Sequence, residues 1–338
     1  MAKGKFTTLP EIFTNFYRNM VNIEVLKAAV NMGFFEYLKS GFKLIEEIKH
    51  AFELKAPTRN LYDFFDELVF LGLLERQGIE ETSAYKNTQS TNMLFLKESP
   101  KNALNFFNLC KEVQKSFQNL ETILKEGHKK DLDLFSEKFC ENKDLSRKFL
   151  HSMKDVNEKN FELTVSNLPV LKDCKTMIDI GGALGVLAVK VKTSYPEMHC
   201  ISFDLPFVAE YAKEYLEKEG FLNKIEMSFG DFFKDEWPKT DVSFMGNILH
   251  DWDYEKKIFL LKKSYERLND GGIFVCVEGF IDDKREKSNV AMIISIAMIV
   301  RTTGYNMTPS EFDKLAKFVG FKKTEYFNNG VEFCIAFK

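Results

Sequence analysis

Residues 177–185 constrain the fold more than any other stretch, because an apolar run there passes into a turn rich in glycine. The run at 176–180 carries Asp179 near its end, and Gly181, Gly182 and Gly185 follow. The next residues, 186–189, are apolar in the manner of a buried helix. An open α/β sheet uses strand, glycine turn and helix to present backbone N–H groups to a ligand. Sheets that bind nothing also contain such turns, so a purely structural interpretation stays open here.

A strand and helix rhythm continues from this stretch toward the end of the chain. Short apolar runs predict further strands at His199–Phe203, Lys224–Ser228, Asp241–Met245 and Gly272–Val277. The segments between them have helical apolar spacing, which implies a parallel sheet with helices on both faces. The last two runs, 324–327 and 331–337, flank an Asn-Gly turn and must therefore pair antiparallel. The predicted fold class is α/β.

The first hundred residues predict a separate helical module. Two short helices, a longer helix that Pro57 can begin, and a small hairpin around Gln77-Gly78 form a winged-helix pattern. DNA binding is disfavoured because the helix that would enter the groove carries three acids, Asp63, Asp66 and Glu67. A protein–protein interface is favoured, since aromatic and apolar residues cover more than one side of that helix.

Composition and charge exclude several classes of partner. The net charge of −3 gives no reason to expect a nucleic acid. The six cysteines are scattered without a C-x-x-C pair, which indicates a reduced, cytoplasmic chain and no metal site. The longest apolar run, Val290–Val300, is shorter than the ~20 residues of a membrane span. We therefore expect no membrane association and interpret this run as a buried helix.

Polar or flexible residues follow the predicted strands, at Gly181–Gly185, Asp204, Asp231, His250 and Glu278. Strand ends on one edge of an α/β sheet share a crevice. Asp204, 19 residues beyond Gly185, suits the two hydroxyls of a ribose, and Asp231 beside Phe232 suits adenine. The sequence therefore predicts an adenosine-containing ligand. The glycine spacing fits the G-x-G-x-x-G pattern of NAD sites poorly, and the C-terminal hairpin favours S-adenosyl-L-methionine.

With these residues in view, the chain resembles a known family. It is similar to small-molecule O-methyltransferases of the class I fold, namely the caffeate-type and acetylserotonin-type enzymes and their bacterial relatives. The stretches that carry the resemblance are 178–182, 203–206, 230–233, 245–252 and 271–278, with 59–76 and 85–88 upstream. The resemblance covers nearly the whole chain.

The resemblance implies an architecture. It implies a Rossmann-like, seven-stranded methyltransferase sheet with an antiparallel C-terminal hairpin. It also implies a winged-helix-like dimerisation domain at 1–100, a helical linker that lines the active site at 101–168, and an S-adenosylmethionine-binding catalytic domain at 169–338. The partners expected from it are a small-molecule acceptor and a second copy of the chain in a homodimer.

The resemblance also implies roles for single residues. His250 would be the general base that removes the acceptor's hydroxyl proton, and Glu278 would orient or polarise it. The residues expected at the cofactor are Gly181, Gly182, Asp204, Leu205, Asp231, Phe232 and Gly246. The residues expected at the acceptor are Phe149, Met153, Met292 and Met298, although helix-like spacing would equally place them in the core.

Three positions depart from the family pattern. Ala183 replaces a glycine of the turn, and Gly246 stands where many plant members have lysine. Asn306 falls near the sequence position at which plant members have a second acid beside the base. Transfer to nitrogen or carbon is therefore an alternative to transfer to oxygen. A second alternative is a weakly active or inactive relative that serves as a dimeric binding or structural subunit.

Overall fold

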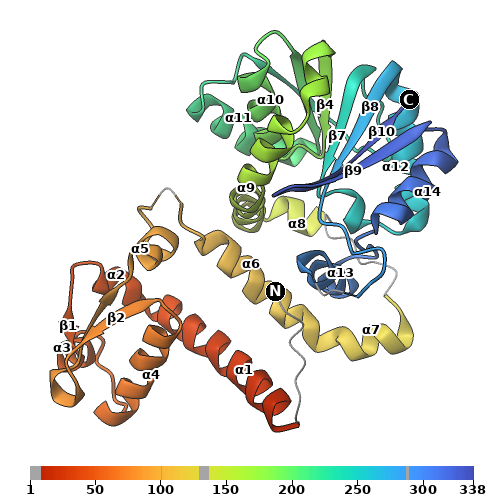
Figure 1. The fold of residues 1–338 in the computed structure, drawn as a ribbon. Helices are drawn as coiled ribbons and strands as arrows, with labels where there is room; N and C mark the ends of the chain where they lie inside the picture. The colour runs from red at the N-terminus through yellow and green to blue at the C-terminus, as the bar shows by residue number, and fades with distance from the viewer. Residues whose placement is uncertain (1–8, 100, 129–136, 287–288) are drawn as a thin grey trace. The chain divides into compact units, whose positions relative to one another are not determined.

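The chain divides into two units, residues 1–104 and 105–338, each with its own hydrophobic core. The structure is a computed structural model that describes residues 9–99, 101–128, 137–286 and 289–338 (Figure 1). Within these ranges no helix has the length and apolar character needed to cross a bilayer.

The first unit consists of short helices and a three-stranded sheet. Its helices are α1 (Leu9–Met32), α2 (Phe34–Leu38), α3 (Ile45–Ala51), α4 (Thr58–Phe70) and α5 (Gln89–Phe95). Its strands are β1 (Lys43–Leu44), β2 (Leu74–Gln77) and β3 (Ala84–Asn87), in the order β1-β3-β2. The predicted hairpin is confirmed, since β2 and β3 pair antiparallel.

The helix predicted after Pro57 is also present, as α4. Proline suits this position because its fixed φ, here −57°, leads into a helix that does not need its missing N–H. Leu61, Phe65 and Leu68 form the buried face of α4. Phe70 is 82% exposed, so the apolar surface of this helix exceeds what its own unit covers.

The second unit is organised around a seven-stranded sheet in the order β6-β5-β4-β7-β8-β10-β9. The parallel strands are β4 (Thr176–Ile180), β5 (His199–Asp204), β6 (Ile225–Phe229), β7 (Thr240–Gly246) and β8 (Leu268–Val277). The antiparallel strands are β9 (Lys323–Asn328) and β10 (Glu332–Phe337), with β10 beside β8. The predicted sheet and its C-terminal hairpin are confirmed, with strand bounds that differ by a few residues.

Helices cover both faces of this sheet (Figure 1). One face packs on α10 (Val186–Ser194) and α11 (Ala209–Lys218), and the other on α12 (Tyr254–Arg267) and α14 (Pro309–Val319). Successive strand residues point to opposite faces, so Cys200 joins the first core and Ile201 the second. A sheet buried on both sides needs nearly continuous apolar strands, as the sequence has.

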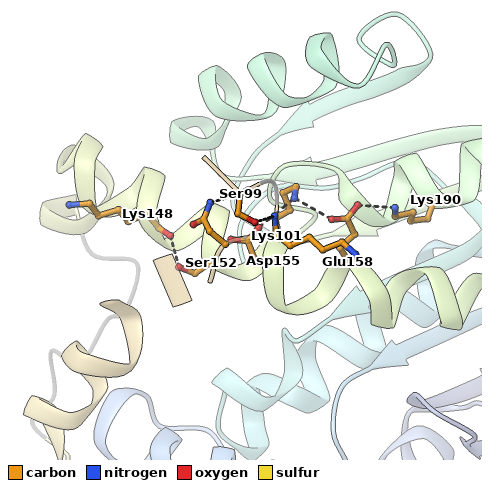
Figure 2. Close-up of polar contacts among 9 residues, drawn as sticks. Ser99, Lys101, Lys148, Ser152, Asp155, Glu158 and Lys190 are labelled. Atoms are coloured by element: carbon orange, nitrogen blue, oxygen red, sulfur yellow. Dashed lines mark hydrogen bonds and ion pairs between the residues drawn. The ribbon is translucent and has the colours of Figure 1, made fainter. Parts of the chain in front are cut away.

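The described residues between 105 and 168 are mostly helical, as predicted, and residues 105–338 form the unit that contains the sheet. The helices are α6 (Leu104–Ser116), α7 (Leu120–Glu126), α8 (Glu137–Glu141) and α9 (Lys143–Ser166). Figure 2 shows how α9 is tied to α10, since Glu158 pairs with Lys190 at 2.9 Å. Glu158 also pairs with Lys154, one turn earlier on α9, at 3.2 Å.

The helix predicted in the apolar run at 290–300 is α13 (Val290–Arg301). The expectation that it is a buried helix was wrong for one of its faces. Ala291, Met298 and Val300 are buried, but Val290 is 71% and Ile293 62% exposed. The helix carries apolar side chains on all of its faces, and the rest of the chain covers only one face.

Candidate active site

The glycine turn between β4 and α10 is shaped by close packing. Gly181 has φ +73°, and a Cβ there would lie 2.3 Å from Cδ1 of Ile248. The N–H groups of Gly181 and Gly182 both donate to the carbonyl of Phe203, at 2.8 and 3.2 Å. A side chain at position 181 is therefore excluded by the protein itself, and the turn is joined to the end of β5.

Asp204 ends β5 and points its carboxylate back to the turn. Its Oδ2 accepts a hydrogen bond from Ala183 N at 2.7 Å, and its Oδ1 accepts one from Leu205 N at 2.7 Å. Each oxygen keeps a further lone pair, and the residue is half-buried. Burial raises the pKa of Asp204 to about 6, although both backbone N–H groups oppose the shift. This carboxylate can therefore accept hydroxyl groups of a ribose.

Asp179, on β4, is a second acid beside the turn. Its Oδ2 lies 2.9 Å from the position that a Cβ of Gly182 would take. Burial raises the pKa of Asp179 to about 8, and the charge of Asp204 adds to the shift. Asp179 is not among the site residues expected from the sequence, although an acid within an apolar strand was a signal for it.

Asp231 and Phe232 follow β6, but their surroundings differ. Oδ1 of Asp231 accepts from Phe233 N at 2.9 Å, and Oδ2 pairs with Lys234 at 2.9 Å. The structure thus gives Asp231 a turn-stabilising role beside any contact with adenine. Phe232 lies next to the glycine turn, since its Cε1 is 4.0 Å from the Cβ position of Gly181. Its ring is edge-on to those of Phe233 and Trp252.

Gly246, at the end of β7, is required by an aromatic ring from α9. A Cβ at this position would lie 2.8 Å from Cε1 and Cζ of Phe161. The neighbouring Asn247 has φ +54° and donates from its side chain to Oδ1 of Asn157 at 2.7 Å. These contacts bring α9 to the strand end. They also explain why position 246 carries no side chain.

His250 lies in a short 3₁₀ helix, η5 (Leu249–Asp251), and is buried. Its Nδ1 has no hydrogen-bond partner among the described residues, and its Nε2 lies 3.7 Å from Oδ1 of Asp251. Burial lowers the pKa of His250 to about 3, and the charges of Lys257 and Arg301 contribute. The imidazole is therefore neutral at physiological pH and has one nitrogen free to accept a proton.

Glu278, directly after β8, contacts the backbone of His250. Its Oε2 accepts from His250 N at 3.2 Å, while Oε1 is buried without a partner in the described part of the chain. Burial raises the pKa of Glu278 to about 7, against the charge of Lys257. A contact between this carboxylate and the imidazole ring stays a prediction.

Two charged residues that the sequence did not single out lie beside this pair. Lys257, on α12, is fully buried, donates to Trp252 O, and places Nζ 3.7 Å from the ring centroid of Tyr305. The second is Asp251, whose carboxyl is the acid near the imidazole. Burial raises its pKa to about 7. A lysine spaced with the apolar face of α12 was the available signal for Lys257.

Four buried polar atoms in this region have no partner among the residues that the structure describes. They are Nδ1 of His250, Nε1 of Trp252, Oε1 of Glu278 and Oδ1 of Asn306. Asn306 is held in place because its Nδ2 donates to Gly279 O at 2.8 Å. Since buried polar groups are normally hydrogen-bonded, this group suits a polar ligand. No cluster of metal-ligand type occurs in the described ranges.

The residues expected at the acceptor lie on two helices. Phe149 and Met153 are half-buried on α9, and Phe149 packs edge-on against Phe139 with ring centroids 5.5 Å apart. Met292 is half-buried and Met298 buried on α13, which packs against η5. Their contact with an acceptor stays a prediction.

The sheet order, the antiparallel hairpin and the acids at the strand ends define a class I methyltransferase fold. The profile of the O-methyltransferase domain family matches residues 108–322, and the chain belongs to this family. Acetylserotonin O-methyltransferase of Gallus gallus is 27% identical over 334 residues, covering 95% of this chain and 94% of the relative. The tetracenomycin polyketide synthesis 8-O-methyl transferase TcmO of Streptomyces glaucescens is 27% identical over 267 residues, covering 78% and 77%.

Solved structures agree with this assignment. Human N-acetylserotonin methyltransferase in complex with S-adenosylmethionine superposes with a TM-score of 0.84 at 24% identity, over 99% of each chain. The predicted family, fold class and enzyme class are thereby confirmed. S-adenosyl-L-methionine is the cofactor of this family, as expected. The residues present fit it, because Asp204 keeps a free lone pair on each oxygen beside a turn that begins with two glycines.

Proposed function

We propose that this enzyme methylates a hydroxyl group of an aromatic or apolar small molecule, with His250 as the general base. The observation that carries the proposal is the buried, neutral imidazole whose Nδ1 has no partner among the described residues, beside the similarly unpaired Oε1 of Glu278. A ligand with a hydroxyl group would supply the missing hydrogen-bond partner for both atoms.

The cofactor would be held at the carboxyl ends of β4 to β7. Asp204, with Leu205 beside it, would bind the ribose. Asp231 and Phe232 would bind the adenine. At Gly181, Gly182 and Gly246 the absence of a side chain would let the cofactor approach the backbone closely. When bound, S-adenosylmethionine supplies an electrophilic methyl group. The chain's contribution is orientation, which is worth about 7–11 kcal/mol in well-aligned reactions.

His250 would accept the proton of the acceptor hydroxyl as the oxygen is methylated. Asp251 near Nε2 favours the tautomer that carries its hydrogen there, which leaves Nδ1 as the acceptor. The same carboxyl would stabilise the imidazolium once the proton has moved. Glu278, through the His250 backbone, would keep the loop in place. General-base assistance of this kind typically contributes about 10²–10⁴-fold.

The apolar side chains of Phe149, Met153, Met292 and Met298 would wall the acceptor site. Support comes from relatives that are named for acetylserotonin and for the synthesis of a polyketide, since both names refer to organic small molecules. An apolar wall excludes water and orients an aromatic ring by contact area.

We also propose that the protein is a homodimer and acts in the cytoplasm. Helix α1 exposes apolar residues at helical spacing, namely Phe13, Phe16, Tyr17 and Met20, and Phe16 is 71% exposed. An exposed apolar row of this size marks an interaction surface. None of the six cysteines forms a disulfide bond, which supports a reducing compartment.

The first experiment is calorimetric titration with S-adenosylmethionine, followed by a screen of phenols for methylation. Asp204→Ala should abolish saturable binding. His250→Ala should bind the cofactor normally but lose about 10²–10⁴-fold in kcat, whereas His199→Ala, at a surface histidine paired with Glu226, should be unchanged. Full turnover in His250→Ala would refute the proposed base. A wild-type chain that does not bind the cofactor would support the inactive-subunit alternative.

A further inference from the structure

Arg301, the last residue of α13, is a half-buried cation beside His250 that the proposed chemistry leaves without a role. Its charge adds to the effects of burial and Lys257 that lower the pKa of the His250 imidazole, and it opposes the rise that burial causes in the pKa of the Asp251 carboxyl. It also opposes the rise that burial causes in the pKa of the Cys110 thiol on α6. Arg301 also ends the helix that packs against η5, the short helix that carries His250.

The chain that follows Arg301 is locked onto this loop. A Cβ at Gly304 would lie 2.1 Å from His250 O and 2.4 Å from Trp252 N, so the two backbones are in direct contact. Thr303 Oγ1 donates to Oδ2 of Asp253 at 3.4 Å, and Gly304 N donates to Thr302 Oγ1 at 3.0 Å. The position of Arg301 relative to the base is thus set by packed backbone.

Within the described ranges, Arg301 makes no hydrogen bond and no ion pair. By contrast, Arg147 pairs with Glu214 and Arg267 with Glu236, both at the surface. Burial of a guanidinium is unfavourable unless hydrogen bonds replace those of water, and it lowers the pKa of Arg301. A helix C-terminus attracts a cation, but an exposed arginine would serve that purpose without the cost of burial.

We propose that Arg301 binds a carboxylate of the acceptor, so that the preferred substrates are aromatic hydroxy acids. The inference rests on the proposed function, because it places the acceptor hydroxyl at His250. A guanidinium offers five donors in a planar fork that fits a carboxylate with two parallel hydrogen bonds. Lys257 is a second cation nearby, and burial keeps the neighbouring acids Asp251 and Glu278 partly protonated, which reduces repulsion of an anion.

The test compares acids with matched neutral acceptors. The probes are para-hydroxybenzoate, para-hydroxyphenylacetate and para-coumarate, each with its primary amide, which span different distances between hydroxyl and carboxylate. We would measure kcat/KM from release of S-adenosylhomocysteine, and Kd by calorimetry with S-adenosylhomocysteine present. The variants are Arg301→Gln, Arg301→Lys and, as the matched control, Arg267→Gln on the surface of α12. Melting curves would establish that each variant is folded.

The inference expects the best acid to exceed its amide by about tenfold or more, and Arg301→Gln to reduce this ratio by roughly 10- to 100-fold. Arg301→Lys, which keeps the charge, should retain part of the preference even if the glutamine variant unfolds. Arg267→Gln should leave the ratio unchanged.

Three results would overturn the inference. One is an acid-to-amide ratio near unity in the wild type. Another is an equal loss for acids and amides in both Arg301 variants, which would mean that Arg301 serves only Asp251 or the fold. The third is an enzyme that binds the cofactor and methylates only the amides. Failure to bind S-adenosylmethionine would instead overturn the proposed function, and the inference with it.

Discussion

Oδ2 of Asp204 accepts a hydrogen bond from the backbone N–H of Ala183 at 2.7 Å. This bond joins the acid at the end of β5 to the one position of the turn where alanine replaces the family's glycine. Ala183 has φ +49°, in the left-handed region that L-residues with a Cβ avoid. The acid that we propose to bind ribose and the strained alanine of the turn are therefore parts of one local structure.

We expect Ala183→Gly to stabilise the protein by about 0.5–1 kcal/mol, because glycine adopts this conformation without the clash of a Cβ. The gain is partial, since glycine has more freedom in the unfolded chain. Urea unfolding measures the difference. Ala188→Gly, in the buried part of α10, should be destabilising by contrast. An equal decrease in the free energy of unfolding in both variants would show that Ala183 is not strained.

Gly246→Ala should destabilise the protein by about 1–3 kcal/mol and weaken cofactor binding, because the new methyl group would overlap the Phe161 ring. Phe161→Leu should relieve the overlap. In a double-mutant cycle with melting and calorimetry as readouts, the two substitutions should therefore compensate. Purely additive effects would mean that the ring moves aside and does not require the glycine.

Asp179 should make the free enzyme less stable as the pH rises. Its pKa is raised to about 8 in the folded protein, so the folded state binds a proton that the unfolded state has released. Its contribution is fully present below its ordinary pKa near 4 and is lost as the pH rises through about 8. Relative to the wild type, Asp179→Asn should gain stability between roughly pH 5 and pH 8. Asp173→Asn, at an exposed site, should not change this pH dependence, and parallel curves for all three proteins would contradict the prediction.

Cofactor binding should release protons near neutral pH. A sulfonium cation close to Asp179 and Asp204 favours their ionised forms, so it lowers pKa values that burial has raised to about 8 and about 6. Calorimetry in buffers of different ionisation enthalpy measures the number of protons released. Asp179→Asn should reduce that number, and no buffer dependence in the wild type would place the cation elsewhere.

The pH profile of methylation should show no ionisation of His250 above about pH 5. Burial and two nearby cations hold its pKa at about 3, so the imidazole stays neutral through the usual assay range. Any acidic limb near neutrality would then belong to Asp251 or Glu278, whose pKa values are raised to about 7. Substitution of Glu278 by glutamine tests this assignment, because the limb should change while His250 remains. A limb near pH 6.5 that disappears only in His250→Ala would contradict it.

Much of this protein could be predicted from local patterns. The apolar runs, the glycine turn, Pro57 before α4 and the Asn-Gly hairpin act through neighbours in the chain, so the elements, the parallel sheet and its antiparallel hairpin followed from the sequence. The strand-end acids Asp204 and Glu278 followed as well, because parallel strands bring their carboxyl ends to one edge.

Tertiary structure alone decided the surroundings of these residues. Phe161 meets Gly246, and Arg301 and Lys257 reach the neighbourhood of His250, across separations that no local pattern records. Helix α13, expected to be buried, is covered on one face only, because composition reports how apolar a helix is but not what packs against it. The pKa shifts of His250, Asp179 and Glu278 likewise arise from burial and from charges that folding brings together. Periodicity and turn chemistry are properties of neighbouring residues, whereas desolvation and side-chain contact exist only once distant segments have packed.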